Sequence, residues 1–302
     1  MSVSGGKDST ATLLLALRQV PRERVYAVFA DTGHEHEVTY RYVREYLPVR
    51  LGITIHEVRA DFREWMEHRR AFVTEHYPAR GVSAEVIARI LAALHPTGNP
   101  YLDLCLIKGR FPSRKAQFCT QFLKTEPLGE YQLALLGQHG AVENWQGVRA
   151  DESPGRALLP EREDRGGGLS IYRPILRWTV AEVFQLLRDE DVEPNPLYRQ
   201  GMKRVGCMPC IHASKDELLE ISRRFPGHIE RVAGWEALVA AASKRGEASF
   251  FPDPDEDAHL HRRGVRNMVE WAKTSRGGVQ YDLVRASDTE PPACASAYGL
   301  CE

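Results

Sequence analysis

The residues best suited to chemistry stand at the start of the chain, in the stretch Ser4-Gly5-Gly6-Lys7-Asp8-Ser9. The apolar lead Met1–Val3 precedes this stretch and the helical run Thr10–Leu17 follows it, which gives the order strand, glycine turn, helix. Backbone N–H groups in such a turn converge with the helix N-terminus on one point, which suits a phosphate. Lys7 adds a positive charge there, and the glycines allow a close backbone approach. An ordinary strand-to-helix turn is the alternative, but the full stretch favours phosphate binding.

Cysteines form the second group of candidates. Cys207 and Cys210 have the Cys-x-x-Cys spacing of a metal knuckle, although the same spacing also suits a redox pair or an accidental one. Cys119 lies in the segment Gly109–Lys124, which carries four cations, and a solvated basic surface is the alternative for those charges. Cys105 stands inside the apolar run Leu102–Ile107, where we expect a buried structural thiol.

The composition is that of a soluble globular protein, with 43% hydrophobic and 27% charged residues over 302 residues. The formal net charge of −1 excludes a general basic field for nucleic acid, but it leaves room for a local basic patch. We find no apolar run as long as a membrane span and no signal peptide, so we expect no membrane partner and a cytoplasmic location. In a reducing compartment, six cysteines favour metal binding or redox chemistry over a disulfide framework.

Parallel strands are expected to position the glycine loop. Val25–Ala30 is a nearly continuous apolar run, as in a buried strand, and it ends in Asp31-Thr32-Gly33. A helix over Glu37–Leu47 and a strand over Ile53–Val58 follow, which is the pattern of a doubly wound α/β sheet. Ligands of such sheets bind at the carboxyl ends of the strands. We therefore expect Asp31 and Thr32 beside the glycine loop, although a simple strand-ending turn would carry the same residues.

The whole chain divides into an α/β domain over residues 1–212 and a helical region with a cysteine-containing tail over residues 213–302. Within the first of these, residues 61–107 form a helical insertion, which we expect to be a lid or an interface. Only three residues precede Ser4, so either the first strand is short or the start codon lies upstream.

Two local patterns lie further along the α/β domain. Leu159–Gly168 is polar and contains three consecutive glycines, which indicates a mobile loop. Thr179 begins a helix with Glu182 three residues later, which is the pattern of a capping box.

Several motifs together resemble one known family. Ser4–Ser9 looks like the loop of the adenine nucleotide alpha-hydrolase, or ATP pyrophosphatase (PP-loop), superfamily. The later motifs resemble those of one branch of this superfamily, the phosphoadenosine phosphosulfate (PAPS) reductases. These motifs are Asp31-Thr-Gly, Cys119…Lys124 with Pro127-Leu128, Gly147-Val-Arg149 with Glu152-Ser153, and the series Arg173-Pro-Ile, Asn195-Pro-Leu-Tyr198 and Gly206-Cys207. The resemblance covers about residues 1–212 without 61–107, and it implies a doubly wound, mostly parallel sheet flanked by helices.

The resemblance also implies a nucleotide site. Its nucleotide-binding residues would be Ser4, Gly5, Gly6, Lys7, Asp8, Ser9, Asp31, Thr32, Gly33, Lys124, Arg149 and Arg156. Arginine grips phosphate with a planar, bidentate fork, although an ordinary salt-bridge loop would also contain such arginines. Lys7 and Asp8 are the candidate catalytic groups of the loop, with Asp8 as a Mg²⁺ ligand or an orienting group. Cys301 is a third candidate, because family reductases end in Glu-Cys-Gly and this tail reads Tyr-Gly-Leu-Cys-Glu.

Iron–sulfur members of the family hold a 4Fe–4S cluster with a Cys-Cys pair and a distant Cys-x-x-Cys. Cys119, Cys207 and Cys210 match three of the four ligand positions, but Thr120 stands where the second cysteine of the pair would be. The fourth ligand would be Cys301 or Cys294 from the tail, or the fourth iron is open. A zinc site on the same three thiolates with His212 is the alternative.

Three functions are compatible with these features. In the first, ATP is cleaved between its α and β phosphates and AMP is then displaced by sulfur, with an iron–sulfur cluster and a sulfur donor protein, as in relatives that thiolate nucleic acid. The intact Gly5-Gly6-Lys7-Asp8-Ser9 favours this function. In the second, adenosine phosphosulfate (APS) or PAPS is reduced to sulfite with a thioredoxin-like reductant. In the third, an iron–sulfur protein senses an adenine nucleotide without turnover. Sulfate adenylylation without redox chemistry leaves the cysteines unexplained.

Overall fold

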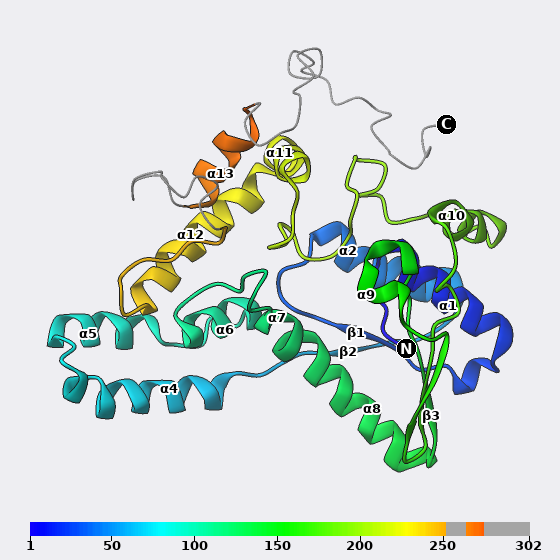
Figure 1. The fold of residues 1–302 in the computed structure, drawn as a ribbon, viewed down its shortest axis with the longest axis horizontal. Helices are drawn as coiled ribbons and strands as arrows, with labels where there is room; N and C mark the ends of the chain where they lie inside the picture. The colour runs from blue at the N-terminus through cyan, green and yellow to red at the C-terminus, as the bar shows by residue number, and fades with distance from the viewer. Residues whose placement is uncertain (252–263, 275–302) are drawn as a thin grey trace. The chain divides into compact units, whose positions relative to one another are not determined.

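The computed structural model describes residues 1–251 and 264–274 (Figure 1). The candidate nucleophile and ligand Cys301 and its alternative Cys294 lie outside the described residues. The described chain divides into two compact units. The first contains residues 1–59 and 124–207, and the second contains residues 60–123, 208–251 and 264–274.

The first unit combines short strands with helices. Its strands are β1 (Ala27–Ala30), β2 (Ile55–Val58), β3 (Val142–Trp145), β4 (Arg162–Gly166) and β5 (Leu169–Tyr172). Its helices are α1 (Lys7–Gln19), α2 (Glu37–Arg41), α3 (Leu47–Leu51), α8 (Glu126–His139), α9 (Pro154–Ala157) and α10 (Val180–Asp189), with the π-helical turn η2 (Tyr42–Tyr46) and the 3-10 turns η1 (Arg22–Arg24) and η5 (Ala150–Glu152).

Most strand pairs of this unit are parallel. β1 pairs with β2 from Ala27↔Ile55 to Ala30↔Val58, and a parallel bridge between Ser2 and Val28 adds the N-terminal residues to the pair. β3 lies parallel to β5, and β4 joins β5 from its other edge in the antiparallel direction. The predicted class, a mostly parallel α/β sheet with flanking helices, is confirmed.

The core of the first unit forms around α1. Every residue from Ser9 to Ala16 is buried, which is expected of a helix enclosed on all sides. α1 packs on α10, and α8 packs on β1, β2 and β3. The start of α1, where the glycine loop ends, is therefore held in a fixed position by the best-packed part of the unit.

None of the described helices combines the length and apolar character needed to cross a bilayer.

The two local patterns have different outcomes. The capping box is confirmed, because the Thr179 hydroxyl accepts the N–H of Glu182 and the Glu182 carboxylate accepts the N–H of Thr179 at 2.7 Å. The prediction of a loop over Leu159–Gly168 is wrong for Arg162–Gly166, which forms the strand β4. Positive φ at Gly166, Gly167 and Gly168 makes the turn into β5. β4 is almost entirely charged and lacks the apolar alternation that would reveal a strand.

The second unit is helical. Its helices are α4 (Arg63–His76), α5 (Ala84–Ala93), α6 (Pro100–Lys108), α7 (Phe118–Thr120), α11 (Lys215–Arg224), α12 (Pro226–Ala242) and α13 (Val265–Ala272), with the 3-10 turn η3 (Pro78–Arg80) and the first residues of the π-helical turn η4 (Gln121–Thr125). α12 packs against α5, α6, α11 and α13. Residues 61–107 therefore share a core with the helices that follow residue 212, and the predicted helical C-terminal region is confirmed over its described part.

Candidate nucleotide site around the glycine loop

The stretch Ser4–Ser9 forms a closed turn that leads into α1. Gly5 has a φ of 75°, which favours glycine, and Gly6 caps the helix in an extended conformation. The Ser9 hydroxyl donates to the Gly6 carbonyl at 3.0 Å and accepts the N–H of Ser4 at 3.1 Å. These internal bonds hold the turn in shape without a ligand, so the N–H groups at the start of α1 are already gathered at one place.

Residues far along the chain hold the same turn from outside. The Asn195 side-chain amide donates to the Gly5 carbonyl at 3.2 Å, and the Lys7 N–H donates to the Tyr198 hydroxyl at 3.0 Å. A side chain on Gly5 would come within 2.9 Å of a Val43 methyl group. Asn195 and Tyr198 are both buried, so the turn is a built part of the core and not a surface loop.

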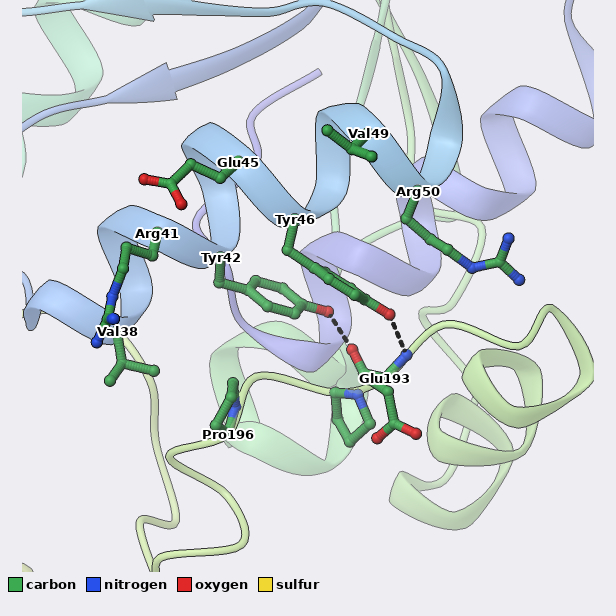
Figure 2. Close-up of a pocket in the computed structure, with 10 residues that line it drawn as sticks. Val38, Arg41, Tyr42, Glu45, Tyr46, Val49, Arg50, Glu193 and Pro196 are labelled. Carbon is green, nitrogen blue, oxygen red and sulfur yellow. Dashed lines mark hydrogen bonds between the residues drawn. The ribbon is translucent and has the colours of Figure 1, made fainter.

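The segment that carries Asn195 and Tyr198 is anchored by two tyrosines of η2 (Figure 2). The Tyr42 hydroxyl donates to the Glu193 carbonyl at 2.7 Å, and the Glu193 N–H donates to the Tyr46 hydroxyl at 2.7 Å. The two rings stack with their centroids 5.1 Å apart. They form one wall of an open pocket of about 710 Å³, and Pro194 and Pro196 of the segment line the same pocket. We assign these tyrosines a supporting role for the glycine turn.

Lys7, Asp8 and Arg149 form a charge cluster at the N-terminus of α1. Lys7 Nζ lies 2.7 Å from one Asp8 oxygen, and Arg149 Nε lies 2.8 Å from the other. The side chains of Lys7 and Arg149 are only 8% and 5% exposed. Arg149 makes a further ion pair at 2.7 Å with Asp151, whose side chain is 52% exposed. Two buried cations thus share one carboxylate, whose side chain is 15% exposed, and a bound anion at this point would find both of them in place.

Gly147 brings the Arg149 segment against the loop. A Cβ atom on Gly147 would lie 2.8 Å from the Asp8 carbonyl oxygen and 2.9 Å from its carbon, both in the backbone. Such a contact is closer than atoms can pack, so either the start of α1 or the segment after β3 would have to move. The glycine is therefore required for the approach of Arg149 to Asp8.

Gly147→Ala is expected to lower the free energy of unfolding by about 1–3 kcal/mol and to weaken pyrophosphate binding, because overpacking displaces the charge cluster. Urea unfolding and pyrophosphate titration would measure both effects. Gly155→Ala is the matched control, because nothing lies within 4 Å of a Cβ atom there. Equal unfolding free energies and equal affinities in the two variants would contradict this role of Gly147.

Asp31 organises the turn after β1. Its carboxylate accepts the N–H of Gly33 at 2.8 Å and the hydroxyl of Tyr40 at 2.7 Å, and it lies 3.3 Å from an Arg44 nitrogen. The residue is 3% exposed. Because the bridge between Ser2 and Val28 is parallel, this turn and the glycine loop leave the sheet at the same edge.

Thr32 lies beside a carboxylate and a thiol that complete the turn. The Thr32 hydroxyl contacts both oxygens of Glu35 at 2.8 and 2.7 Å, and Cys207 Sγ lies 3.7 Å from Glu35 and 3.8 Å from the Thr32 hydroxyl. Burial is the main cause that raises the pKa of Tyr40, and the charge of Glu35 and the hydrogen bond to Asp31 raise it further. The Tyr40 hydroxyl therefore stays protonated and can donate to the carboxylates of Asp31 and Glu35. Glu35 was not among the predicted site residues, although three consecutive titratable residues, His34-Glu35-His36, follow Asp31-Thr32-Gly33.

The remaining predicted phosphate ligands occupy more open positions. Lys124 lies half-buried in η4. Arg156 lies in α9, is 45% exposed at its side chain, and pairs with Glu152. Glu152 also accepts the N–H of Arg149 at 3.1 Å. Burial alone would raise the pKa of Glu152, but the Arg149 N–H and the charge of Arg156 outweigh burial and lower that pKa.

The candidate cluster cysteines are divided between the two units. Cys207 belongs to the first unit, and Cys119 and Cys210 belong to the second. Within the second unit, Cys105 is fully buried, as expected of a structural thiol. Burial, and to a smaller extent the neighbouring Cys119, raise the pKa of the Cys105 thiol well above its ordinary value. A common metal site of Cys119, Cys207 and Cys210 stays a prediction from spacing and family resemblance.

A second pocket opens directly on the glycine loop. It has a volume of about 520 Å³ and is bounded by Ser4 and Ser9 on one side, by α8, and by Gly147 and Val148 after β3. Its position beside the N-terminus of α1 and its mixed polar and apolar wall suit a heterocyclic base or ribose attached to a phosphate at the loop.

The model of the phosphoadenosine phosphosulfate reductase domain family matches residues 1–87 and 106–213 of the chain. The chain belongs to this family. The matched segments of the PAPS reductase domain include the glycine loop, the turn after β1, Arg149 and both cysteines of the Cys-x-x-Cys pair.

Individual proteins resemble the chain over two thirds of its length or more. The 37.8 kDa protein in the gpa 5′ region of Escherichia phage 186 is 48% identical, over 100% of this chain and 96% of that protein. Adenosine 5′-phosphosulfate reductase of Allochromatium vinosum is 34% identical, over 67% of this chain and 75% of that protein. Among solved structures, PAPS reductase from Candida auris superposes with a TM-score of 0.42 and 19% identity, over 68% of this chain and 79% of that chain.

Proposed function

We propose that this member of the PAPS reductase family binds an adenine nucleotide at Ser4–Ser9 and cleaves ATP between its α and β phosphates, releasing pyrophosphate and coupling the adenylation to sulfur transfer. The observation that carries the proposal is the convergence of Lys7 and Arg149 on Asp8 at the N-terminus of α1. The intact Gly5-Gly6-Lys7-Asp8-Ser9 supports ATP over a preformed sulfonucleotide.

The chain's own residues would act mainly by charge. The N–H groups at the start of α1 and the two buried cations would hold the pyrophosphate portion of ATP. As the bond between the α and β phosphates breaks, negative charge grows on the departing pyrophosphate, and preorganised cations stabilise that charge without reorganisation. The pocket beside Ser4, Ser9 and Val148 would take the adenosine portion and direct the α phosphate toward the acceptor.

Asp8 fits the role of an orienting group better than that of a metal ligand. Each of its carboxylate oxygens already accepts from a cation, Lys7 on one side and Arg149 on the other. Mg²⁺ is commonly held by substrate phosphates and water with one or two carboxylates. We therefore assign Mg²⁺ chiefly to the phosphate oxygens of ATP, and we assign Asp8 to holding the two cations in place.

Cys119, Cys207 and Cys210 are the ligands we propose for an iron–sulfur cluster, with Cys301 or Cys294 as the fourth ligand or with an open iron. Thiolates are the donors that such clusters require, and three thiolates with His212 would also suit zinc. When bound, the cluster would supply or relay sulfur. The Thr32 hydroxyl lies 3.8 Å from Cys207 Sγ, and hydrogen bonds to ligating sulfur are one of the means by which proteins tune such groups.

Reduction of APS or PAPS to sulfite is the second candidate function, because a 34% identical relative is an adenosine 5′-phosphosulfate reductase. It would require a thioredoxin-like reductant and a nucleophilic thiol, for which Cys301 is the candidate. A nucleotide-sensing iron–sulfur protein is the third candidate.

One product assay separates these functions. The full chain, reconstituted anaerobically with iron and sulfide, would be given either ATP with Mg²⁺, a sulfide donor and a nucleic-acid acceptor, or APS and PAPS with reduced thioredoxin. We expect AMP and pyrophosphate in equal amounts from ATP, and little sulfite. Sulfite from APS or PAPS without pyrophosphate from ATP would overturn the proposal in favour of the reductase. Tight nucleotide binding with neither product would leave the sensor.

A further inference from the structure

The second unit carries a row of cations that the proposed nucleotide chemistry does not use. Lys108, Arg110, Arg114 and Lys115 follow one another with no Asp or Glu anywhere between residues 104 and 123. None of the four forms an ion pair within residues 1–251 or 264–274. The arginines of α4, by contrast, are engaged, for example Arg63 with Asp61 and Arg70 with backbone carbonyls of α5 and its C-cap. Four positive charges that no carboxylate of the described residues neutralises are unusual in one segment of a chain whose formal net charge is −1.

A tight turn presents two of these cations. The N–H of Ser113 donates to the Ala116 carbonyl at 3.1 Å, and the N–H of Ala116 donates to the Ser113 carbonyl at 3.1 Å. The Ser113 hydroxyl also accepts the Ala116 N–H at 3.2 Å. Arg114 and Lys115 occupy the tip of this turn and are both exposed. The backbone of the tip is thus ordered, while its two charges are available to an anion.

Aromatic rings alternate with the other two cations. Lys108 Nζ lies 4.7 Å from the ring centre of Phe122 and 5.6 Å from that of Trp65, and these rings meet edge to face at 5.0 Å. The guanidinium of Arg110 lies 5.7 Å from the ring centre of Phe118. Trp65 is 38% exposed, although tryptophan is usually far more buried. Trp65 comes from α4, Lys108 ends α6 and Phe122 lies in η4, so these ring contacts bring α4, α6 and η4 together.

We propose that this surface, the basic strip of Trp65, Lys108, Arg110, Arg114, Lys115 and Phe122, binds single-stranded nucleic acid. A row of unpaired cations suits successive phosphates of one strand, whereas a free mononucleotide would engage only one or two of them. An exposed indole offers a stacking face to an unpaired base, and cations interleaved with aromatic side chains are typical of sequence-tolerant single-strand binding. If the bound nucleic acid also accepts the transferred sulfur, that role rests on the proposed function. The binding of nucleic acid to the strip is independent of the proposed function.

The test uses the full chain without ATP, and fluorescence anisotropy of labelled oligothymidine and oligouridine of about 20 nucleotides. We expect binding that weakens with salt. Arg114→Glu with Lys115→Glu should weaken it at least about tenfold and reduce the slope of log affinity against log salt by about 1.4, because each lost phosphate contact to a single strand accounts for about 0.7. Trp65→Ala should weaken binding about tenfold, and Trp65→Phe should retain most of it.

Arg80→Glu with Arg223→Glu is the matched control, because it makes the same change of charge at two exposed arginines of the second unit outside the strip. We expect it to change affinity by less than about twofold. Absence of oligonucleotide binding would overturn the proposal, as would equal weakening by the control. Equal affinity for a duplex, or for polyglutamate, with no effect of Trp65→Ala would also overturn it. Since ATP is absent, these outcomes are independent of whether the chain cleaves ATP.

Discussion

Lys7→Met is expected to lower kcat/KM for pyrophosphate release from ATP by roughly 10²–10³-fold, because one preorganised cation facing the leaving group is lost. Methionine has a similar length and suits a side chain that is 8% exposed. Asp8 keeps its ion pair with Arg149 at 2.8 Å, so the variant should remain folded. The measurement is steady-state pyrophosphate release at several ATP concentrations, together with thermal unfolding.

Lys244→Met is the control for Lys7→Met, because it removes an exposed lysine from the second unit. We expect wild-type kinetics from it. A Lys7→Met protein with wild-type kcat/KM and an unchanged unfolding temperature would remove Lys7 from the catalytic machinery.

Asp8→Asn should have the largest effect on stability. The substitution leaves Lys7 and Arg149 buried without the carboxylate they share, and breaking a buried ion pair costs about 3–5 kcal/mol. Pyrophosphate should restore stability to this variant by more than it stabilises the wild type, because the anion then takes the place of the carboxylate that Lys7 and Arg149 shared. Urea unfolding with and without pyrophosphate measures both quantities.

Asp151→Asn provides the comparison for Asp8→Asn. Asp151 also pairs with Arg149, but its side chain is 52% exposed, so the expected loss is less than about 1 kcal/mol. If the Asp8→Asn variant is as stable as the Asp151→Asn variant, or if pyrophosphate stabilises it less than the wild type, Asp8 does not act by holding the two cations. The second of these outcomes would instead indicate that Asp8 contacts the ligand or its Mg²⁺.

Local patterns allowed much of the first unit to be predicted. The predicted run Val25–Ala30 contains β1, the capping box at Thr179 starts α10, and the glycine turn leads into a buried helix at Lys7. Each of these features is written in a few neighbouring residues, either as apolar continuity or as a cap, so a single sequence is enough to find it.

The contacts that hold the site could not be predicted in the same way. Asn195 and Tyr198 reach the glycine turn across 190 and 191 residues, and Glu35 meets Cys207 across 172. Such pairings depend on the order of strands and helices in space, which local propensity does not contain. The same reason applies to residues 61–107, whose association with the helices after residue 212 is a property of tertiary packing.

The most direct test of the nucleotide site is a crystal structure with α,β-methylene-ATP and Mg²⁺, in which the bond between the α and β phosphates cannot be cleaved. We expect the β and γ phosphates at the N-terminus of α1, with Lys7 and Arg149 in contact with phosphate oxygens while Asp8 still holds both cations. Adenosine should occupy the pocket beside Ser4, Ser9 and Val148. An analogue bound elsewhere, with no phosphate oxygen near Lys7 or Arg149, would contradict the proposed function.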